Sequence, residues 1–146
     1  MQISNYNISQ IYRAVSAARK GAVMEYRIII PGRLDNLNDY ISAERTNRFK
    51  GAKMKGDNQE RVFQEVCIQL GDVHINGPVK MSYKWYEKDR RRDLDNISSF
   101  GRKVIQDAIV QAGILPDDGW KYIKGFTDEF YVDKEYPRIE VTITEL

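Results

Sequence analysis

Apolar positions near the start of the chain recur at helical spacing. Residues 4–19 place apolar side chains three or four positions apart, and Gly21 ends the pattern. We expect a short amphipathic helix here, in a helical extension over residues 1–23, followed by one domain over residues 24–146. The spacing alone leaves open whether this helix is instead an integral part of the domain.

The rest of the chain changes between strand and helix periods. Ile28-Ile29-Ile30 is typical of a buried strand, and residues 79–86 alternate apolar with polar side chains as a half-buried strand does. The expected elements are a strand at 25–31, a loop at 32–56, a helix at 57–70, a strand at 79–86, a helix at 96–112, and strands within 121–132 and at 139–143. This order predicts a small α/β domain.

Capping residues mark the expected helix starts. Asp57-Asn58-Gln59-Glu60 resembles a capping box, and Cys67 falls on the apolar face that follows, where we expect it to pack. Asp95 is a good N-cap for the helix over 96–112. The segment 32–56 lacks apolar periodicity, so it is either a functional loop or a mobile surface loop.

Composition limits the sites that the chain can build. Its 146 residues suffice for one domain, and its single Cys67 and single His74 exclude an internal disulfide and a thiolate or imidazole zinc site. Any metal site must therefore use oxygen ligands, and we assign His74 no role beyond the surface. No run reaches the ~20 apolar residues that cross a bilayer, so we expect a soluble, cytoplasmic protein.

The net charge of +2 is too small to attract nucleic acid through an overall field, so local clusters matter more. Residues 45–55 interleave basic side chains with Phe49 and contain no acidic residue. Such a segment suits the DNA backbone, with the aromatic ring stacking on a base, although a basic loop without function is the alternative. A second cluster is Arg90-Arg91-Arg92.

The second cluster adjoins two closely spaced carboxylates, Asp93 and Asp95. Mg²⁺ prefers carboxylate oxygens and arginine grips phosphate, so one short segment could hold a metal and a polyanionic substrate. Side chains two positions apart in extended backbone point to the same side and can share a cation. The alternative is that Asp95 only caps the helix while Asp93 pairs with a neighbouring arginine.

Two further features carry functional groups. Lys103 falls on the polar face of the helix at 96–112, where it could steady charge at a phosphate or simply be solvated. Asp117-Asp118 follows that helix. The pair either closes an ordinary turn or, if strand 121–132 lies beside strand 79–86, is brought toward a neighbouring site or one formed across a dimer.

Taken together and in order, these motifs resemble the RusA family of Holliday junction resolvases. The motifs are Asp89-Arg90-Arg91-Arg92-Asp93-Leu94-Asp95-Asn96, Asp107 to Gly113, Pro116-Asp117-Asp118 and Ile139 to Glu145. The resemblance is strong over about 79–146, weaker over 25–70 and absent over 1–23. It implies a mixed sheet flanked by helices, in a protein that forms a symmetric homodimer.

The resemblance also implies site residues. The family's essential carboxylates fall on Asp93, Asp95 and Asp118. Asp117 is the adjacent alternative to Asp118, and the set would bind one or two Mg²⁺ ions, with Mn²⁺ as a substitute. The family's lysine falls on Lys103 when the helix end is the anchor, and on Ser99 when counting starts at Asp95. We place it at Lys103.

The implied activity is that of a Mg²⁺-dependent endonuclease that resolves four-way DNA junctions by paired nicks, in recombination and repair. The residues expected to bind DNA are Arg90, Arg91, Arg92, Arg45, Arg48, Lys50, Lys53 and Lys55. Two alternatives stay open: a metal-dependent nuclease for flaps or other branched DNA, and a junction-binding protein without catalysis.

Overall fold

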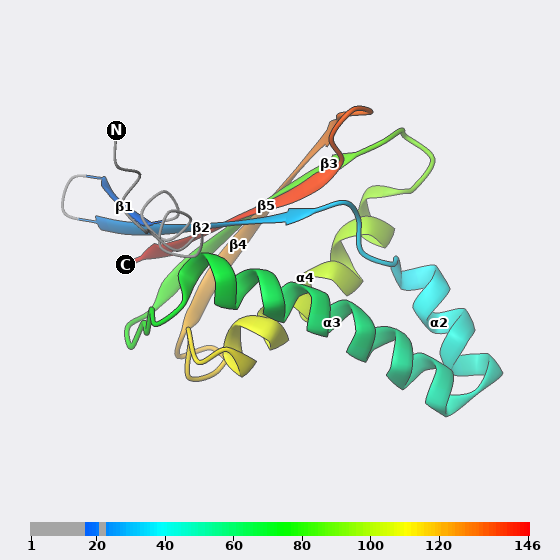
Figure 1. Ribbon diagram of the computed structural model, residues 1–146, viewed down its shortest axis with the longest axis horizontal. Helices are drawn as coiled ribbons and strands as arrows, with labels where there is room; N and C mark the ends of the chain where they lie inside the picture. Colours follow the sequence, from blue (N-terminus) through cyan, green and yellow to red (C-terminus); the bar gives the residue numbers. More distant parts are fainter. Residues whose placement is uncertain (1–16, 21–22) are drawn as a thin grey trace, which may run out of the picture.

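Five strands form one mixed sheet in the order β1-β2-β5-β3-β4 (Figure 1). The computed structural model describes residues 17–20 and 23–146. The strands are β1 (Ala17–Lys20), β2 (Val23–Pro31), β3 (Val79–Glu87), β4 (Ile123–Val132) and β5 (Arg138–Glu145). Neighbouring strands are antiparallel except β3 and β4, which are parallel. The expected mixed α/β fold is confirmed. Strands β3 and β4 are neighbours, which is the arrangement that one of the two alternatives for the Asp117-Asp118 turn required.

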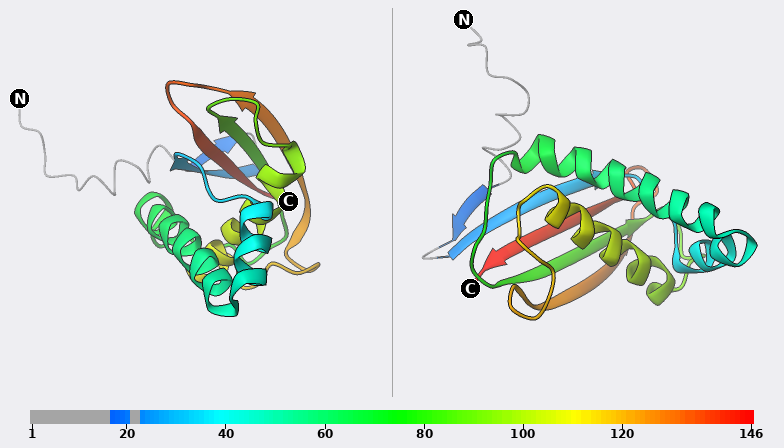
Figure 2. Two further views of the ribbon diagram at one scale, coloured as in Figure 1. Left: turned by 90° about the vertical axis from the view of Figure 1, so that its right-hand side faces the viewer. Right: turned by 90° about the horizontal axis from the view of Figure 1, so that it is seen from below.

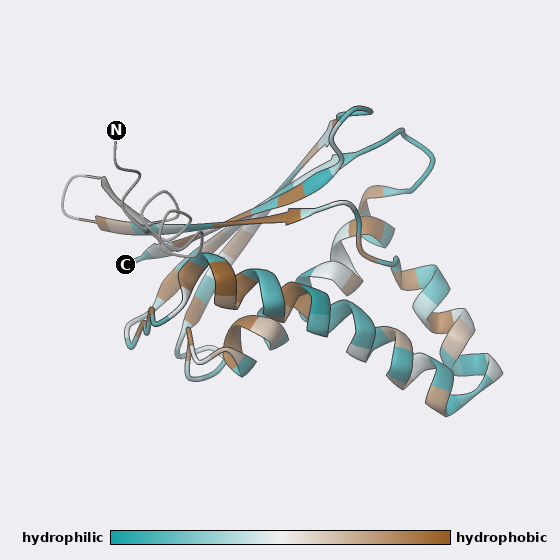
Figure 3. Cartoon of the chain, viewed as in Figure 1, coloured by the Kyte–Doolittle hydropathy of each residue, from teal (hydrophilic) through white to brown (hydrophobic). Residues whose placement is uncertain are grey.

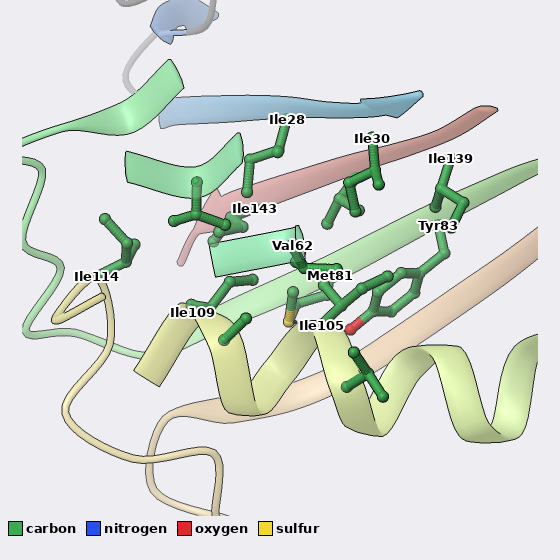
Figure 4. Close-up of a cluster of buried hydrophobic side chains, with 14 of the residues drawn as sticks. Ile28, Ile30, Val62, Met81, Tyr83, Ile105, Ile109, Ile114, Ile139 and Ile143 are labelled. Carbon is green, nitrogen blue, oxygen red and sulfur yellow. Dashed lines mark hydrogen bonds between the residues drawn. The ribbon is translucent and has the colours of Figure 1, made fainter. Parts of the chain in front are cut away.

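Three helices cover one face of this sheet (Figure 2). They are α2 (Leu37–Thr46), α3 (Arg48–Leu70) and α4 (Leu94–Gln111). The buried side chains of β3 point toward these helices, and the residues between them are less buried. The buried side chains are Val79, Met81, Tyr83 and Trp85. The core forms where isoleucines of β2 and β5 meet Val62 of α3 and Ile105 and Ile109 of α4 (Figure 4). The predicted alternation of β3 and the apolar stripe of α4 are both confirmed.

Gly101 lets α4 approach the end of β3 closely. A Cβ at this position would lie 2.7 Å from Cη2 of Trp85, a distance that real side chains do not tolerate. The absence of a side chain therefore allows the helix to pack directly on the indole. This contact sets the first half of α4 against the C-terminal end of β3, where the candidate site lies.

The segment 32–56 is mostly helical, so the prediction of a loop there is wrong. Asn36 is the N-cap of α2, and its Oδ1 accepts a hydrogen bond of 2.8 Å from the backbone N of Asp39. Asn47 caps α3 in the same way through the backbone N of Phe49. Because α3 already begins at Arg48, Asp57 lies inside the helix and does not begin a capping box.

Exposure explains why this pair of helices escaped detection. In α2 and the first half of α3, the only fully buried residues are Ala43, Gly51 and Asn58. Most of the segment is hydrophilic where α3 and α2 extend away from the sheet (Figure 3). A helix that buries so little carries no apolar stripe, and its period is therefore invisible in the sequence.

Three smaller expectations also need correction. Cys67 is exposed, because the buried stripe of α3 runs through Val62, Val66 and Leu70 and leaves it at the side. Asp93, not Asp95, is the N-cap of α4. Residues 17–20 pair with β2 as a strand, so the expected helix does not include 17–19, and its remainder lies outside the described residues.

Two other expectations concern the surface and the membrane. His74 is exposed, as expected, and its Nδ1 lies 2.7 Å from the carbonyl oxygen of Gly113. Within the described part of the chain, no helix has the length and apolar character needed to span a bilayer.

Candidate active site

Asp93 and Asp95 lie where α4 begins. Asp93 has extended backbone (φ −69°, ψ 149°), but its side chain makes no capping hydrogen bond. Asp95 lies in the first helical turn, where the helix dipole favours negative charge. Both side chains are exposed, and within the described residues neither forms an ion pair. The alternative in which one caps the helix and the other pairs with arginine is therefore not what the structure shows.

The backbone differs from the geometry that we expected for this pair. Only Asp93 is extended, whereas Leu94 and Asp95 already belong to the helix. Side chains two positions apart on a helix do not face the same direction, so the argument from strand alternation does not apply. Any cation shared by the two carboxylates must lie over the tip of α4, between an extended residue and the first turn.

A cleft of about 480 Å³ opens beside Asp93. Leu94 and Ile97 of α4 line it together with Phe130 and Val132 of β4. Its polar lining comes from the end of β3 and the loop that follows, and consists of Glu87, Asp89, Arg90, Arg92 and Asp93. The cleft thus places an apolar wall next to one of the two exposed carboxylates.

Glu87 is a buried carboxylate beside the site that the sequence analysis missed. Its side chain is 8% exposed, and its Oε1 lies 3.5 Å from both Nη1 of Arg33 and Nη1 of Arg92. A signal for it was present, because Glu87 continues the core-facing series of β3 that runs through Tyr83 and Trp85. A charged residue at such a position needs partners, since burying an unpaired charge is costly.

The three consecutive arginines have different environments. Arg92 is only 17% exposed, and besides Glu87 it donates a hydrogen bond of 3.1 Å to the carbonyl oxygen of Leu34. Arg90 and Arg91 are exposed, and Nε of Arg91 lies 3.7 Å from Asp89. The structure therefore gives Arg92 an internal contact and leaves Arg90 and Arg91 facing solvent.

Asp89 shapes the loop that carries these arginines. Its Oδ1 accepts a hydrogen bond of 3.0 Å from the backbone N of Arg91, closing a turn two residues long. This backbone hydrogen bond lowers the pKa of Asp89, and Arg91 adds to the effect. Asp89 therefore stays ionised in mildly acidic solution.

Asparagine side chains fix the start of α4 relative to its neighbours. Oδ1 of Asn96 accepts a hydrogen bond of 2.8 Å from the backbone N of Asn38, which joins α4 to the first turn of α2. The buried Asn58 of α3 bonds both the backbone N and the carboxylate of Asp35, at 3.0 and 2.7 Å. The segment before α2 is thereby held against α3, and the first turn of α2 is held against the start of α4.

Lys103 lies halfway along α4 and joins two carboxylates. Its Nζ lies 3.0 Å from Oδ1 of Asp107 and 3.1 Å from Oδ2 of Asp118. These hydrogen bonds raise the pKa of Lys103 above its ordinary value. The ammonium group is therefore a permanent positive charge and not a proton acceptor at neutral pH.

Asp107 extends this network to α3 through a 2.9 Å ion pair with Lys55. Partial burial acts to raise the pKa of Asp107, but the hydrogen bonds from Lys55 and Lys103 outweigh it and hold the pKa below its ordinary value. Lys55, which we expected to contact DNA, is thus paired with another residue of the chain, although its side chain stays 34% exposed. The network connects α3, α4 and the turn after α4.

The alternatives named for the lysine and for the turn make different contacts in the structure. The Ser99 hydroxyl donates to the carbonyl oxygen of Asp95 within its own helix, at 2.6 Å. Asp117 is exposed, and its Oδ2 would lie 2.8 Å from a Cβ at Gly119. Of the alternatives, the pair in mutual contact is Lys103 and Asp118.

Asp118 does not join Asp93 and Asp95 in one cluster. Lys103, which it contacts, comes eight residues after Asp95, so about 12 Å of helix separates the two positions. Among the described residues, no group of three or more Asp, Glu, His or Cys side chains is arranged to hold a metal ion. The single chain therefore offers two acidic groups, one at the tip of α4 and one along its side.

Asp128 of β4 is a further carboxylate that the sequence analysis passed over. Its Oδ1 accepts a hydrogen bond of 2.8 Å from Nε1 of Trp85, and its Oδ2 is ion-paired with Arg102 of α4. Strand periodicity could have revealed Asp128 in the sequence. It alternates with Phe126 and Phe130, which lie on the face of β4 that is turned toward α4. Asp128 thus links β4 to α4 between the two acidic groups.

The basic segment 45–55 forms the corner between α2 and α3. Arg45, Arg48 and Lys50 are exposed there, and Phe49 is 81% exposed at the first turn of α3. The corner is tight, because a Cβ at Gly51 would lie 2.4 Å from Cγ of Glu44. Lys53 is also exposed but pairs with Asp57 at 2.7 Å. The segment is therefore a rigid basic corner and not a flexible loop.

Comparison with known proteins assigns the chain to a family. The family model of the RusA endodeoxyribonuclease matches residues 38–144, from the start of α2 to the end of β5. A search of curated proteins found no match. The matched range includes Asp93, Asp95, Lys103 and Asp118, and the family consists of Holliday junction endonucleases that generally depend on a divalent metal. Since the match covers most of the 146 residues, the chain belongs to the RusA family of endodeoxyribonucleases.

Proposed function

We propose that this enzyme is a Mg²⁺-dependent Holliday junction resolvase that cuts paired strands as a symmetric homodimer. The observation that carries the proposal is the pair of exposed carboxylates at the tip of α4, Asp93 and Asp95, which have no ion pair among the described residues. Such groups lie at a helix N-terminus, where the backbone also favours phosphate. Branched DNA is the substrate class of the family.

The donor set at the tip of α4 fits Mg²⁺. This ion keeps several of its waters and is commonly held by one or two carboxylates together with substrate phosphates, so Asp93 and Asp95 suffice as protein ligands. When bound, the metal would activate a water and stabilise the leaving oxygen. The oxygen ligands and the absence of a second cysteine or histidine in the sequence favour Mg²⁺ or Mn²⁺ over zinc.

The residues around Asp93 and Asp95 would each have a separate role in binding or cleavage. Glu87 and Arg92 hold the loop before α4, so that Asp93 keeps its position. Lys103, fully protonated beside Asp107 and Asp118, supplies a fixed positive charge for a phosphate along the side of α4. Asp118 acts in the described conformation by orienting Lys103, and it could ligate an ion near Asp93 only after leaving that contact.

The exposed basic residues are proposed to bind the DNA backbone. Arg90 and Arg91 flank the acidic tip, and Arg45, Arg48 and Lys50 project from the α2–α3 corner. Contacts of this kind give affinity that falls steeply with salt and carries little sequence information. Arg92 and Lys55 are left out of this set, because their partners lie within the protein. Lys53 would first have to leave Asp57.

A homodimer accounts for paired nicks. A four-way junction is nearly two-fold symmetric, and a protein with two-fold symmetry presents two identical sites to its opposing strands. Sedimentation velocity at micromolar concentration is expected to give a species of twice the 17.0 kDa chain mass. A monomer at these concentrations, with full cleavage activity, would contradict this part of the proposal.

The activity is tested on a labelled four-way junction, a flap and a linear duplex, each with and without Mg²⁺. We expect cleavage of the junction by the wild type with Mg²⁺, and none by Asp93→Asn, which should still bind. Asp57→Asn, an exposed carboxylate on α3, is the matched control and should cut normally. Preference for the flap would indicate a nuclease for other branched DNA. Binding without nicks on any substrate would indicate a non-catalytic protein.

A further inference from the structure

Trp120 is almost wholly exposed to solvent. Its side chain is 95% exposed, whereas Trp85, the other tryptophan of the chain, is 2% exposed in the core. An indole is large and mostly apolar, and tryptophan is highly buried on average in folded proteins. The position of Trp120 is defined, since the carbonyl oxygen of the residue accepts a hydrogen bond of 2.9 Å from Nζ of Lys124.

A cleft of about 530 Å³ lies beside this indole, between α4 and the start of β4. Trp120 and the half-exposed Phe126 give it aromatic surface, and Lys103 and Lys124 give it positive charge. Asp118, which is paired with Lys103, contributes the one carboxylate of the lining. The guanidinium of Arg102 lies 4.6 Å from the centre of the Phe126 ring and steadies that ring from the helix side. The cleft therefore combines flat aromatic faces with cations.

The local sequence carries the same combination. Residues 120–126 read Trp-Lys-Tyr-Ile-Lys-Gly-Phe, with aromatics and lysines interleaved and no acidic residue. The first lysine of the segment, Lys121, places its Nζ 5.4 Å from the centre of the Tyr122 ring. This is the composition that binds single-stranded nucleic acid, in which rings stack on bases and cations follow the phosphates.

We propose that Trp120 and Phe126, with Lys103 and Lys124, form a stacking site for an unpaired nucleobase of branched DNA. The inference rests on the proposed function and deepens it, because a flap, or a junction that is opened at its branch point, exposes unpaired bases and a linear duplex does not. Lys103 connects this site to the phosphate-binding side of α4, since it lines the cleft and also contacts Asp118. Trp120 is thus assigned to substrate binding and not to the chemical step.

The charge of the cleft favours DNA over a second protein chain as the occupant. The central part of a protein–protein interface is depleted in lysine, because desolvating an ammonium group is costly. Here Lys103 and Lys124 line the cleft together with Trp120, and both would stay solvated against a phosphate backbone. A base supplies a flat face of the size that one indole covers.

The test uses the fluorescence of Trp120, since Trp85 is shielded in the core. The full-length protein is titrated without metal, so that nothing is cut, with a junction carrying unpaired bases at its centre and with a linear duplex of equal length. We expect strong quenching by the branched DNA and little by the duplex. Quenching of equal size by both, or by neither, overturns the inference.

Variants separate stacking from general binding. Trp120→Ala should weaken binding of the branched DNA about tenfold, as expected for loss of a stacked base, whereas Trp120→Phe should restore most of the affinity. Tyr136→Ala removes an exposed aromatic from the β4–β5 turn and should change nothing. Unchanged affinity of Trp120→Ala would overturn the inference.

Two readouts distinguish the stacking site from a dimer interface at Trp120 and from the proposed nuclease activity. A blue shift of the wild-type emission with rising protein concentration, in the absence of DNA, would mean that a second copy of the chain covers Trp120, and the stacking site would be ruled out. Cleavage with Mg²⁺ is measured separately. Absence of nicks together with quenching by branched DNA would contradict the proposed function and still support the stacking site.

Discussion

Lys103 and Asp118 are joined by a hydrogen bond of 3.1 Å that ties the middle of α4 to the turn fifteen residues later. Asp118 of the turn therefore lies beside Lys103, and not beside Asp93 and Asp95. The contact also connects the side of α4 to the aromatic cleft at Trp120, because Lys103 and Asp118 both line that cleft. The role of Lys103 in DNA cleavage is therefore the first one to test.

Lys103→Ala is expected to lower kcat on a four-way junction about a hundredfold, because a fixed charge that stabilises a phosphate in the transition state is lost. Lys103→Arg keeps the charge and should recover part of the rate. Arg27→Ala is the control, since Arg27 is an exposed cation that pairs with Glu140 on the opposite face of the sheet. Single-turnover cleavage measures all three, and equal rates for them would exclude a role for Lys103.

Gly101→Ala is expected to destabilise the fold by about 1–3 kcal/mol, because the added methyl group would overpack Trp85. Gly56→Ala, on the exposed part of α3, meets nothing within 4 Å and should leave the stability unchanged or raise it by up to about 1 kcal/mol. Urea unfolding followed by circular dichroism gives both values. Equal stability of the two variants would show that α4 is not packed on Trp85 this closely.

Glu87→Gln is expected to destabilise the fold by about 1–3 kcal/mol, since it leaves Arg33 and Arg92 without their shared carboxylate in a partly buried place. Cleavage should fall as well, because the loop before α4 loses its anchor. Asp57→Asn, which breaks the exposed pair with Lys53, should cost less than about 1 kcal/mol. Wild-type cleavage by a folded Glu87→Gln protein would remove Glu87 from the positioning of Asp93.

Asp107 is expected to make the fold sensitive to acid. Its pKa in the folded protein lies below the ordinary value of 3.8, so the unfolded chain binds the proton more tightly. The stabilisation is therefore present above about pH 4 and is lost as the pH falls through the lowered pKa. Asp107→Asn should be less stable than the wild type at pH 6, and the gap between them should narrow toward pH 3. A difference in stability between the two proteins that widens as the pH falls would contradict this prediction.

The elements that bury a regular stripe are the ones that could be predicted from the sequence. The alternation of β3 and the apolar face of α4 come from side chains that meet the same core at every second or every third to fourth position. The helices α2 and α3 could not be found in this way over 37–56, because they are mostly solvent-exposed there and carry no apolar stripe. Their N-caps, Asn36 and Asn47, were the signal that the sequence did offer.

The candidate site, too, could be predicted only where residues are neighbours in the sequence. By itself the sequence determined that Asp93 and Asp95 lie at the start of a helix that follows a strand, beside three arginines, because neighbours in the chain stay neighbours in the fold. Only the tertiary structure decided that Glu87 is buried between Arg33 and Arg92, that Lys103 meets Asp118, and that Trp120 stays exposed. Those outcomes depend on how β3, β4 and α4 pack, and packing brings together residues that no local period connects.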